Sequence, residues 1–468
     1  MAFPYMEAVV GLRTANEPNV RRAIREPFGG KFICVQKFFS YSKMNEHEQR
    51  SRSFVYVHER PYIFETYLDL RQHAALKLPT SLPKTLEGVI SQTYLEKCRA
   101  YSIDKSNFHF VKQFVTIIMD SATLLFGVLP WIWKVGVVLE STGVDAENEI
   151  YHTLTFLAGA MIWSQITDLP FYLYSTFVIE ERYGINKQTV WLFIKDMIKG
   201  MMLAIIIGPP VVAAIILIVQ KGGPYLAIYL WGFMFVLSLV TMTIYPVLIA
   251  PLYNKLTPLP EGELRARIET LASSLNFPLK KLFVVDESTR STCSNAYLYG
   301  FYKNKRIVLY DNLIQKCKNV EEVVAVVAHE LGHWKLNHTV YLFVAFQVLI
   351  ILLFGGYALV KNSKDLFMSF GFDSQPTLIG LMLYMQTIIP VLPLIIFGHN
   401  FVRRAFEFQA DAFAKKLGYS KPLGDSLVKQ EGNLSGLNAD PWYSAYHYSH
   451  PTLVERLAAL DEPHNKAD

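Results

Sequence analysis

The chain has 468 residues, of which 51% are hydrophobic and 18% charged, and its formal net charge is +5 at pH 7. A mean hydropathy of +0.22 argues against a set of purely soluble domains and implies that much apolar surface faces lipid. The modest charge gives no reason to expect a nucleic-acid partner. The four cysteines lack the CxxC spacing of a zinc or redox motif.

Residues 1–65 form an atypical N-terminal segment, because charged side chains interrupt each apolar run before it is long enough to cross a bilayer. The segment also lacks the basic region and apolar core of a secretory signal. The next segment, 66–107, is polar and basic, and we expect it to lie in the cytosol.

Six apolar stretches approach the ~20 residues that a membrane-spanning helix needs. They cover 114–139, 152–177, 201–219, 225–250, 341–360 and 377–398. The first four predict transmembrane helices within 108–250, and the last two predict a transmembrane hairpin over 341–398. Basic residues in the short connections place three segments on the cytosolic side, namely 66–107, 251–340 and 399–468.

The segment 251–340 has the pattern of a small α+β region. Glu261–Leu275 predicts a helix, and Leu282–Val285 a short strand. Ala296–Tyr302 and Arg306–Tyr310 predict two further strands joined by a turn. An exposed sheet edge here could accept a peptide substrate as an additional strand.

The same segment contains His329-Glu330-Leu331-Gly332-His333, which has the form HExxH within a helical pattern that Asn319 can cap. Residues four apart share a helix face, so His329 and His333 can present their imidazoles to one ion. Glu330 lies one step round, where its carboxylate can reach a water molecule beside the metal. This spacing is typical of zinc proteases. A chance match on a buried helix is the alternative.

Two histidines leave a catalytic zinc short of one protein ligand. Glu407 and Asp411 lie four residues apart beyond the last apolar stretch, among phenylalanines and alanines where a lone carboxylate would be costly. We therefore predict that Glu407 is the third ligand of one zinc ion per chain. Asp411 would orient one of the histidines through its other ring nitrogen.

Amide hydrolysis also needs a group that stabilises the oxyanion. The sequence offers His447, His450 and Arg456 without ranking them, and we take His450 as the catalytic candidate. His338 and His399 are interpreted as structural. His333 precedes the apolar stretch at 341–360 by only eight residues, about 12 Å of helix. The site should therefore lie at the cytosolic membrane boundary.

Several stretches together resemble the type I CAAX prenyl proteases over roughly residues 66–468. They are Glu180–Thr189, Ser294–Tyr297, His329–His333, Glu407–Asp411 and Tyr448–Pro451. The resemblance implies a mainly α, multi-pass membrane protein with seven spans. These spans form a helical barrel that encloses a chamber and carries a small α+β zinc metalloprotease domain. It also implies that Asn295 contacts the substrate backbone and that Arg456 is a substrate-binding residue near the active site.

The function implied by the resemblance is removal of the last three residues after a farnesylated cysteine, with a second, upstream cut in some substrates. The implied partners are a farnesylated CAAX protein or peptide and membrane lipid, with no nucleic acid. The implied location is the endoplasmic reticulum membrane, and possibly the inner nuclear membrane, with the zinc domain facing the cytosol.

Two features depart from the family pattern. No adequate apolar run lies within 31–64, where the family has its first span, and Arg403 stands where the family usually has serine. Two other functions remain open at this point. One is a membrane quality-control protease of the same zinc superfamily, and the other is a non-catalytic membrane scaffold or channel.

Overall fold

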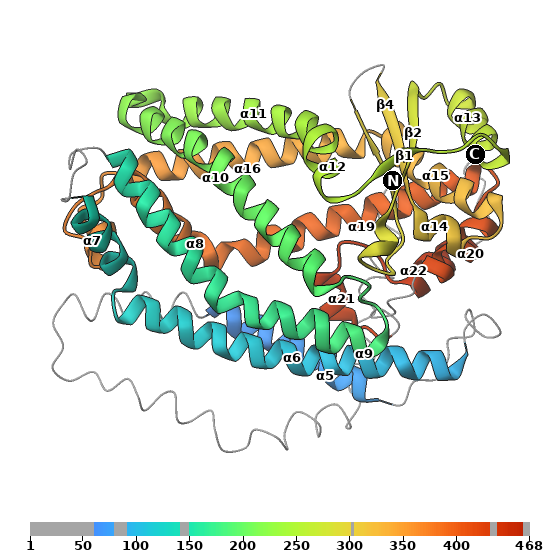
Figure 1. Cartoon of the computed structure of the whole chain (residues 1–468), viewed down its shortest axis with the longest axis horizontal. Coiled ribbons are helices and arrows are strands. Elements are labelled where there is room, and N and C mark those ends of the chain that lie inside the picture. The colour runs from blue at the N-terminus through green and yellow to red at the C-terminus, as the bar shows by residue number, and fades with distance from the viewer. Residues whose placement is uncertain (1–59, 79–90, 141–148, 301–303, 431–437, 462–468) are drawn as a thin grey trace, which may run out of the picture.

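The small sheet lies toward one end of the molecule, and long helices extend away from it to the other end (Figure 1). This computed structural model describes residues 60–78, 91–140, 149–300, 304–430 and 438–461. The question of a first span within 31–64 lies outside these residues, apart from the start of the helix α5 (Arg60–Lys77).

The helical end of the molecule is built from long, mostly apolar helices. They are α6 (Gln92–Leu125), α7 (Val128–Glu140), α8 (Glu149–Tyr174), α10 (Val190–Lys221), α11 (Leu226–Ile244), α16 (His338–Val360), α18 (Thr377–Ile388) and α19 (Leu392–Lys416). Shorter helical segments connect them, namely α9 (Glu181–Tyr183), α12 (Ala250–Tyr253) and α17 (Lys364–Ser369), with π-helical turns at Ser175–Glu180 and Tyr245–Ile249.

The structure tests the predicted count of six spans by helix length and apolar composition. Among the described residues, four helical segments are long and apolar enough to cross a membrane: Val190–Lys221, Gly223–Tyr253, His338–Val360 and Thr377–Lys416. A fifth exists if α6 and α7, which meet at a bend of 62°, form one broken span. The stretch predicted at 152–177 forms α8 but is not among these segments. Its polar residues, including Gln165 and Asp168, dilute its apolar character.

The long helices form a closed ring. Successive members contact one another in the order α5, α6, α7, α8, α10, α11, α16 and α18. Helix α19 follows α18 along the chain and contacts α21 (Pro441–His447), which returns to α5. The last contact includes Arg71, which donates two hydrogen bonds of 3.2 and 2.9 Å to the carboxylate of Asp440. This ring is the predicted helical barrel, and its water-filled interior stays a prediction.

The sheet has four strands in the order β1-β2-β4-β3. They are β1 (Leu256–Pro258), β2 (Leu279–Val285), β3 (Ala296–Tyr299) and β4 (Lys305–Tyr310). Strands β2 and β4 are parallel, whereas the two outer pairs are antiparallel. β3 is therefore an edge strand, and it contacts the helix α15 (Val320–Lys335).

Most of the predicted elements in this region exist with shifted ends. The helix expected at Glu261–Leu275 is α13 (Glu263–Ser274). The strand predicted up to Tyr302 ends at Tyr299, because Gly300 turns at φ 109° and a side chain there would collide with the Asn304 backbone. Residues 301–303 lie outside the described part. The sequence did not predict β1 or the short helix α14 (Asp311–Lys316).

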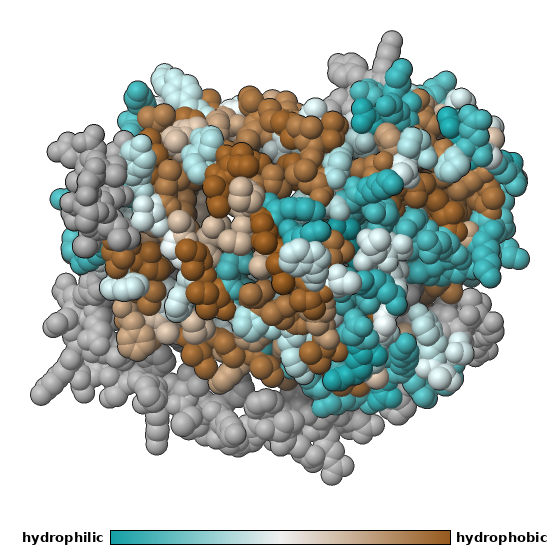
Figure 2. Space-filling view, in the orientation of Figure 1, coloured by the Kyte–Doolittle hydropathy of each residue, from teal (hydrophilic) through white to brown (hydrophobic). Residues whose placement is uncertain are grey.

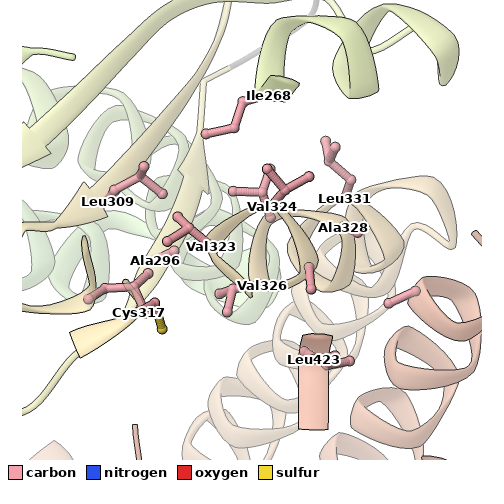
Figure 3. Close-up of a cluster of buried hydrophobic side chains, with 14 of the residues drawn as sticks. Ile268, Ala296, Leu309, Cys317, Val323, Val324, Val326, Ala328, Leu331 and Leu423 are labelled. Carbon is pink, nitrogen blue, oxygen red and sulfur yellow. The ribbon is translucent and has the colours of Figure 1, made fainter. Parts of the chain in front are cut away.

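The main hydrophobic core surrounds α15 and draws on two distant segments of the chain. Figure 3 shows the α15 side chains Val323 and Val324 in the middle, between Leu309 of β4 and Leu423 of α20 (Ser420–Gln430). The helix α22 (Leu453–Asp461) completes this core with Leu453 and Leu460. Residues before α16 and residues after α19 thus form one packed unit, which we call the peptidase region.

The surface of the helical ring differs from that of the peptidase region. Hydrophobic residues cover the helices, whereas hydrophilic residues gather around the sheet (Figure 2). In each of the four apolar segments, only 0% to 22% of the most apolar 18 residues are buried inside the protein. Apolar side chains exposed on this scale indicate a surface that faces lipid.

Candidate metal centre

Helix α15 presents the HExxH residues on a rigid and well-capped support. The Asn319 side chain accepts a hydrogen bond of 3.0 Å from the Glu321 backbone N–H, which confirms the predicted N-cap. Glu322 pairs instead with Lys429 on α20, through two contacts of 2.6 Å. Both contacts fix the first turn of α15.

Helix α19 brings the two predicted carboxylates against α15. The helices contact each other directly, and Gly332, inside the HExxH motif, permits the approach. A Cβ at Gly332 would lie 3.2 Å from Ala410 Cα and 3.1 Å from the Phe413 ring. Glu407 and Asp411 are both buried, at 6% and 1% exposure, on the side of α19 that faces the histidines.

The structure brings His329, His333 and Glu407 together as a compact set of donor atoms. The two Nε2 atoms are 3.1 Å apart, and the Glu407 oxygens lie 3.3 Å from His329 Nε2 and 3.5 Å from His333 Nε2. Ligands at ~2.0–2.1 Å around a tetrahedral zinc are separated by about 3.3 Å. The donor set therefore fits a zinc ion.

The second ring nitrogen of each histidine has its own partner. His329 Nδ1 lies 2.8 Å from Asp411 Oδ1, the kind of contact that the sequence predicted for Asp411. His333 Nδ1 lies 2.9 Å from His338 Nδ1. With both Nδ1 atoms acting as donors, two Nε2 lone pairs and a carboxylate converge on one point. Such a cluster is well suited to bind a cation.

Of the three oxyanion candidates, the structure brings two to the site. His450 Nε2 lies 3.3 Å from Glu407 Oε1, and the His450 side chain is 53% exposed. Arg456 donates to both oxygens of Asp411, at 2.8 and 2.6 Å, and its guanidinium lies 3.8 Å from Glu407. His447 instead packs between the rings of Tyr443 and Tyr446.

Glu330 takes part in none of these ion pairs. Within the described part of the chain its carboxylate has no hydrogen-bond partner, which leaves it available to a water molecule or a substrate amine. Burial raises the pKa of Glu330 to about 7, although the charge of His329 opposes this shift. A carboxylate with a pKa near neutrality is well matched to accept and return a proton.

The two histidines differ in their affinity for protons. Burial, reinforced by the neighbouring His329, lowers the pKa of His333 to about 4, so its ring is neutral and ready to bind a metal. Burial also opposes charge on His329, but hydrogen bonds to Asp411 and Glu407 outweigh it and raise the pKa to about 9. A metal must therefore displace a proton from His329.

Asn295 immediately precedes the edge strand β3. Its side chain is exposed, and its Oδ1 accepts a hydrogen bond of 2.8 Å from the Ala296 backbone N–H. Its backbone oxygen accepts another from Tyr310. Asn295 thus shapes the start of the strand that runs along α15.

The sequence missed one partner of the cluster. His338, interpreted as structural, contacts His333, and its Nε2 lies 3.1 Å from Gln409 Oε1 on α19. The sequence does show a third histidine five residues after the motif. If the HExxH helix continued through His338, however, that side chain would point away from His333. His399, the other histidine interpreted as structural, is exposed on α19.

Comparisons with known proteins agree with the site. A family model described as CAAX prenyl protease N-terminal, five membrane helices, matches residues 72–255, where the sequence predicted four spans. The peptidase family M48 matches residues 258–464. The CAAX prenyl protease 1 homolog of Arabidopsis thaliana is 72% identical over 409 residues, covering 87% of this chain and 96% of the relative. The chain belongs to the type I CAAX prenyl proteases.

Other members of the family are similar over comparable lengths. The human CAAX prenyl protease 1 homolog is 43% identical, covering 85% of this chain and 92% of the relative. The crystal structure of S. mikatae Ste24p superposes with a TM-score of 0.83 at 37% identity, covering 90% of this chain and all of that one. This CAAX prenyl protease is therefore a membrane metalloprotease. The comparisons favour neither the scaffold nor the quality-control alternative.

Proposed function

We propose that the protein removes the last three residues of farnesylated CAAX proteins at a single zinc ion held by His329, His333 and Glu407. The observation that carries the proposal is the convergence of these three donors at separations of 3.1–3.5 Å in a member of this family. A second, upstream cleavage in some substrates belongs to the same proposal.

When bound, zinc supplies a Lewis acid that polarises the scissile carbonyl and makes water more acidic. Glu330 accepts the proton from the attacking water and then passes it to the leaving amine, so that one amide bond and one water become a carboxylic acid and an amine. Its unpaired carboxylate and raised pKa support this role. Asp411 holds His329 in the tautomer whose Nε2 faces the metal.

His450 stabilises the negative charge that develops on the carbonyl oxygen. Support comes from its exposed side chain, which stands 3.3 Å from Glu407 at the edge of the donor set. Arg456 is less available for this task, because its guanidinium is already paired with Asp411. Its position supports a role in fixing the carboxylates and the substrate end next to them. Asn295 aligns the substrate backbone along β3.

The farnesyl group provides much of the binding energy. Each CH₂ that leaves water contributes about 0.8 kcal/mol, but a lipid that leaves a bilayer gains far less. The preference for prenylated peptide should therefore be strong in detergent and smaller in intact bilayers. We place the protein in the endoplasmic reticulum membrane or the inner nuclear membrane, with the peptidase region in the cytosol, as the basic loops suggest.

The decisive experiment compares cleavage of a farnesylated and an unprenylated C-terminal peptide by the purified protein in detergent. We expect rapid cleavage of the farnesylated peptide only, and none by Glu330→Ala, which should still bind the peptide. Equal cleavage of both peptides would contradict lipid recognition and favour a quality-control protease.

A metal analysis tests the ligands separately. Purified protein should contain one zinc per chain, and Glu407→Ala should lose it or bind it much more weakly. Full retention of zinc by that variant would mean that the third ligand lies elsewhere.

A further inference from the structure

His338 is the first residue of α16, and it is buried at 2% exposure beside the metal donors. Its Nδ1 faces His333 Nδ1 at 2.9 Å, and its Nε2 faces Gln409 Oε1 at 3.1 Å. We propose that His338 is a positioning residue for His333. His338 accepts a hydrogen bond from Nδ1–H of His333 and so directs the Nε2 lone pair of His333 at the metal. This inference rests on the zinc centre proposed above.

The chemistry of the contacts allows one arrangement of protons. To ligate a metal through Nε2, His333 must carry its proton on Nδ1 and act as a donor there. His338 Nδ1 must then be the acceptor, which leaves the His338 proton on Nε2. That proton meets the Gln409 side-chain oxygen, which accepts it. The side-chain oxygen of Gln409 is thus placed to accept the proton of the tautomer that His333 needs.

The backbone and one aromatic ring hold His338 in this orientation. Helix α15 ends at Lys335, and Asn337 adopts a left-handed conformation with φ 59° before α16 begins. Asparagine tolerates this conformation better than most residues. The turn directs His338 back toward His333. The ring of Phe406 then stacks on the His338 ring, with centroids 4.1 Å apart and planes 2° from parallel.

The two histidine ligands are therefore supported in different ways by the same helix. His329 meets the charged carboxylate of Asp411, whereas His333 meets a neutral imidazole that is itself held by Phe406 and Gln409. A neutral acceptor raises the basicity of its histidine less than a carboxylate does. Loss of His338 should consequently weaken zinc binding less than loss of Asp411.

The test uses three variants of the full-length protein in detergent. His338→Asn keeps an acceptor near the Nδ1 position, His338→Leu has nearly the same shape as asparagine without the acceptor, and His338→Phe keeps a stack on Phe406. Zinc affinity is measured by competition with a chelator. Removing such a supporting partner typically weakens metal binding about 10–100-fold. We expect His338→Leu and His338→Phe to bind zinc about 10-fold more weakly, and His338→Asn to stay within about 3-fold of wild type.

A role in packing alone predicts the opposite order, because leucine and phenylalanine suit the face of Phe406 better than asparagine does. Equal zinc affinity in all three variants, or stronger binding by leucine and phenylalanine than by asparagine, would overturn the proposal. If His338→Phe fails to fold, comparing His338→Asn with His338→Leu provides the same test. His399→Leu, at an exposed histidine of α19, should leave zinc affinity unchanged.

The outcome separates this inference from the proposed function. Wild-type protein without zinc would contradict the zinc centre itself. Zinc in the wild type, together with unchanged affinity in the leucine and phenylalanine variants, would contradict only the role of His338.

Discussion

Helices α15 and α10 are both rich in apolar residues, yet they use them in different ways. Ten of the 16 residues of α15 are buried inside the peptidase region. In α10, which has 32 residues, the buried residues are only Ile216 and Val219. The first helix is stabilised by burial within protein, and the second by an environment that the protein itself does not supply. Apolar residues in a helix can therefore indicate burial within the protein or exposure to lipid, and the neighbouring elements determine which of the two applies.

The largest expected effect concerns the peptidase region alone. Glu330→Gln should lower the rate of peptide cleavage roughly 10²–10⁴-fold, because an amide cannot accept the proton that Glu330 transfers. Zinc content, measured on the same preparation, should remain at the wild-type value. A variant that cleaves within a factor of two of wild type would remove Glu330 from the mechanism.

A pair of matched substitutions tests the comparison directly. Leu331 is fully buried on α15, whereas Leu352 on α16 is 66% exposed. Leu331→Ala should lower the free energy of unfolding by about 2–5 kcal/mol, as core truncations do. Leu352→Ala should change it by less than about 0.5 kcal/mol in detergent.

Thermal unfolding of the purified variants in one detergent measures both effects. Similar losses of stability in the two variants would show that Leu352 is packed against protein, and the contrast between the two regions would then fail.

A smaller effect should follow from breaking one ion pair of the peptidase region. Glu322 is buried at 5% exposure and pairs with Lys429. Lys429→Met removes the cationic partner of this carboxylate and should cost about 1–2 kcal/mol, a value reduced by the partial exposure of the lysine. The double variant Glu322→Gln, Lys429→Met should recover part of the loss of thermal stability. No recovery would mean that the lysine acts through its packing.

The smallest expected effect concerns the start of α15. Asn319→Ala removes the side-chain oxygen that accepts from the Glu321 N–H and should cost about 1 kcal/mol. Asn319→Asp retains an acceptor and should be neutral. Both values come from the same thermal unfolding assay, and equal destabilisation by the two substitutions would argue against a capping role.

The convergence of the donor residues in space could be predicted from local periodicity. His329 and His333 share a helix face because they are four residues apart, and the same spacing places Glu407 and Asp411 together on α19. Charged residues among phenylalanines then pointed to a buried, partnered pair. The resemblance to the prenyl proteases added the barrel and the family, which local patterns do not contain.

The sequence could not show features that depend on a single residue or on distant parts of the chain. Asn337 breaks the helix and turns His338 toward the site, an event that no periodicity reveals. The pairing of Arg456 with Asp411 joins residues 45 positions apart. The span predicted at 152–177 forms α8, which is less apolar than the four segments named above because its polar residues dilute it.

Helix α19 has a mechanical consequence. Leu394, 70% exposed near its beginning, and Glu407, 6% exposed near its end, lie on one unbroken helix about 20 Å apart. A membrane whose thickness does not match the apolar length of such a helix changes its tilt. Because the rod is continuous, a tilt imposed at the lipid end displaces the carboxylates at the other. We therefore expect acyl-chain length in the surrounding bilayer to influence the alignment of Glu407 with the histidines of α15.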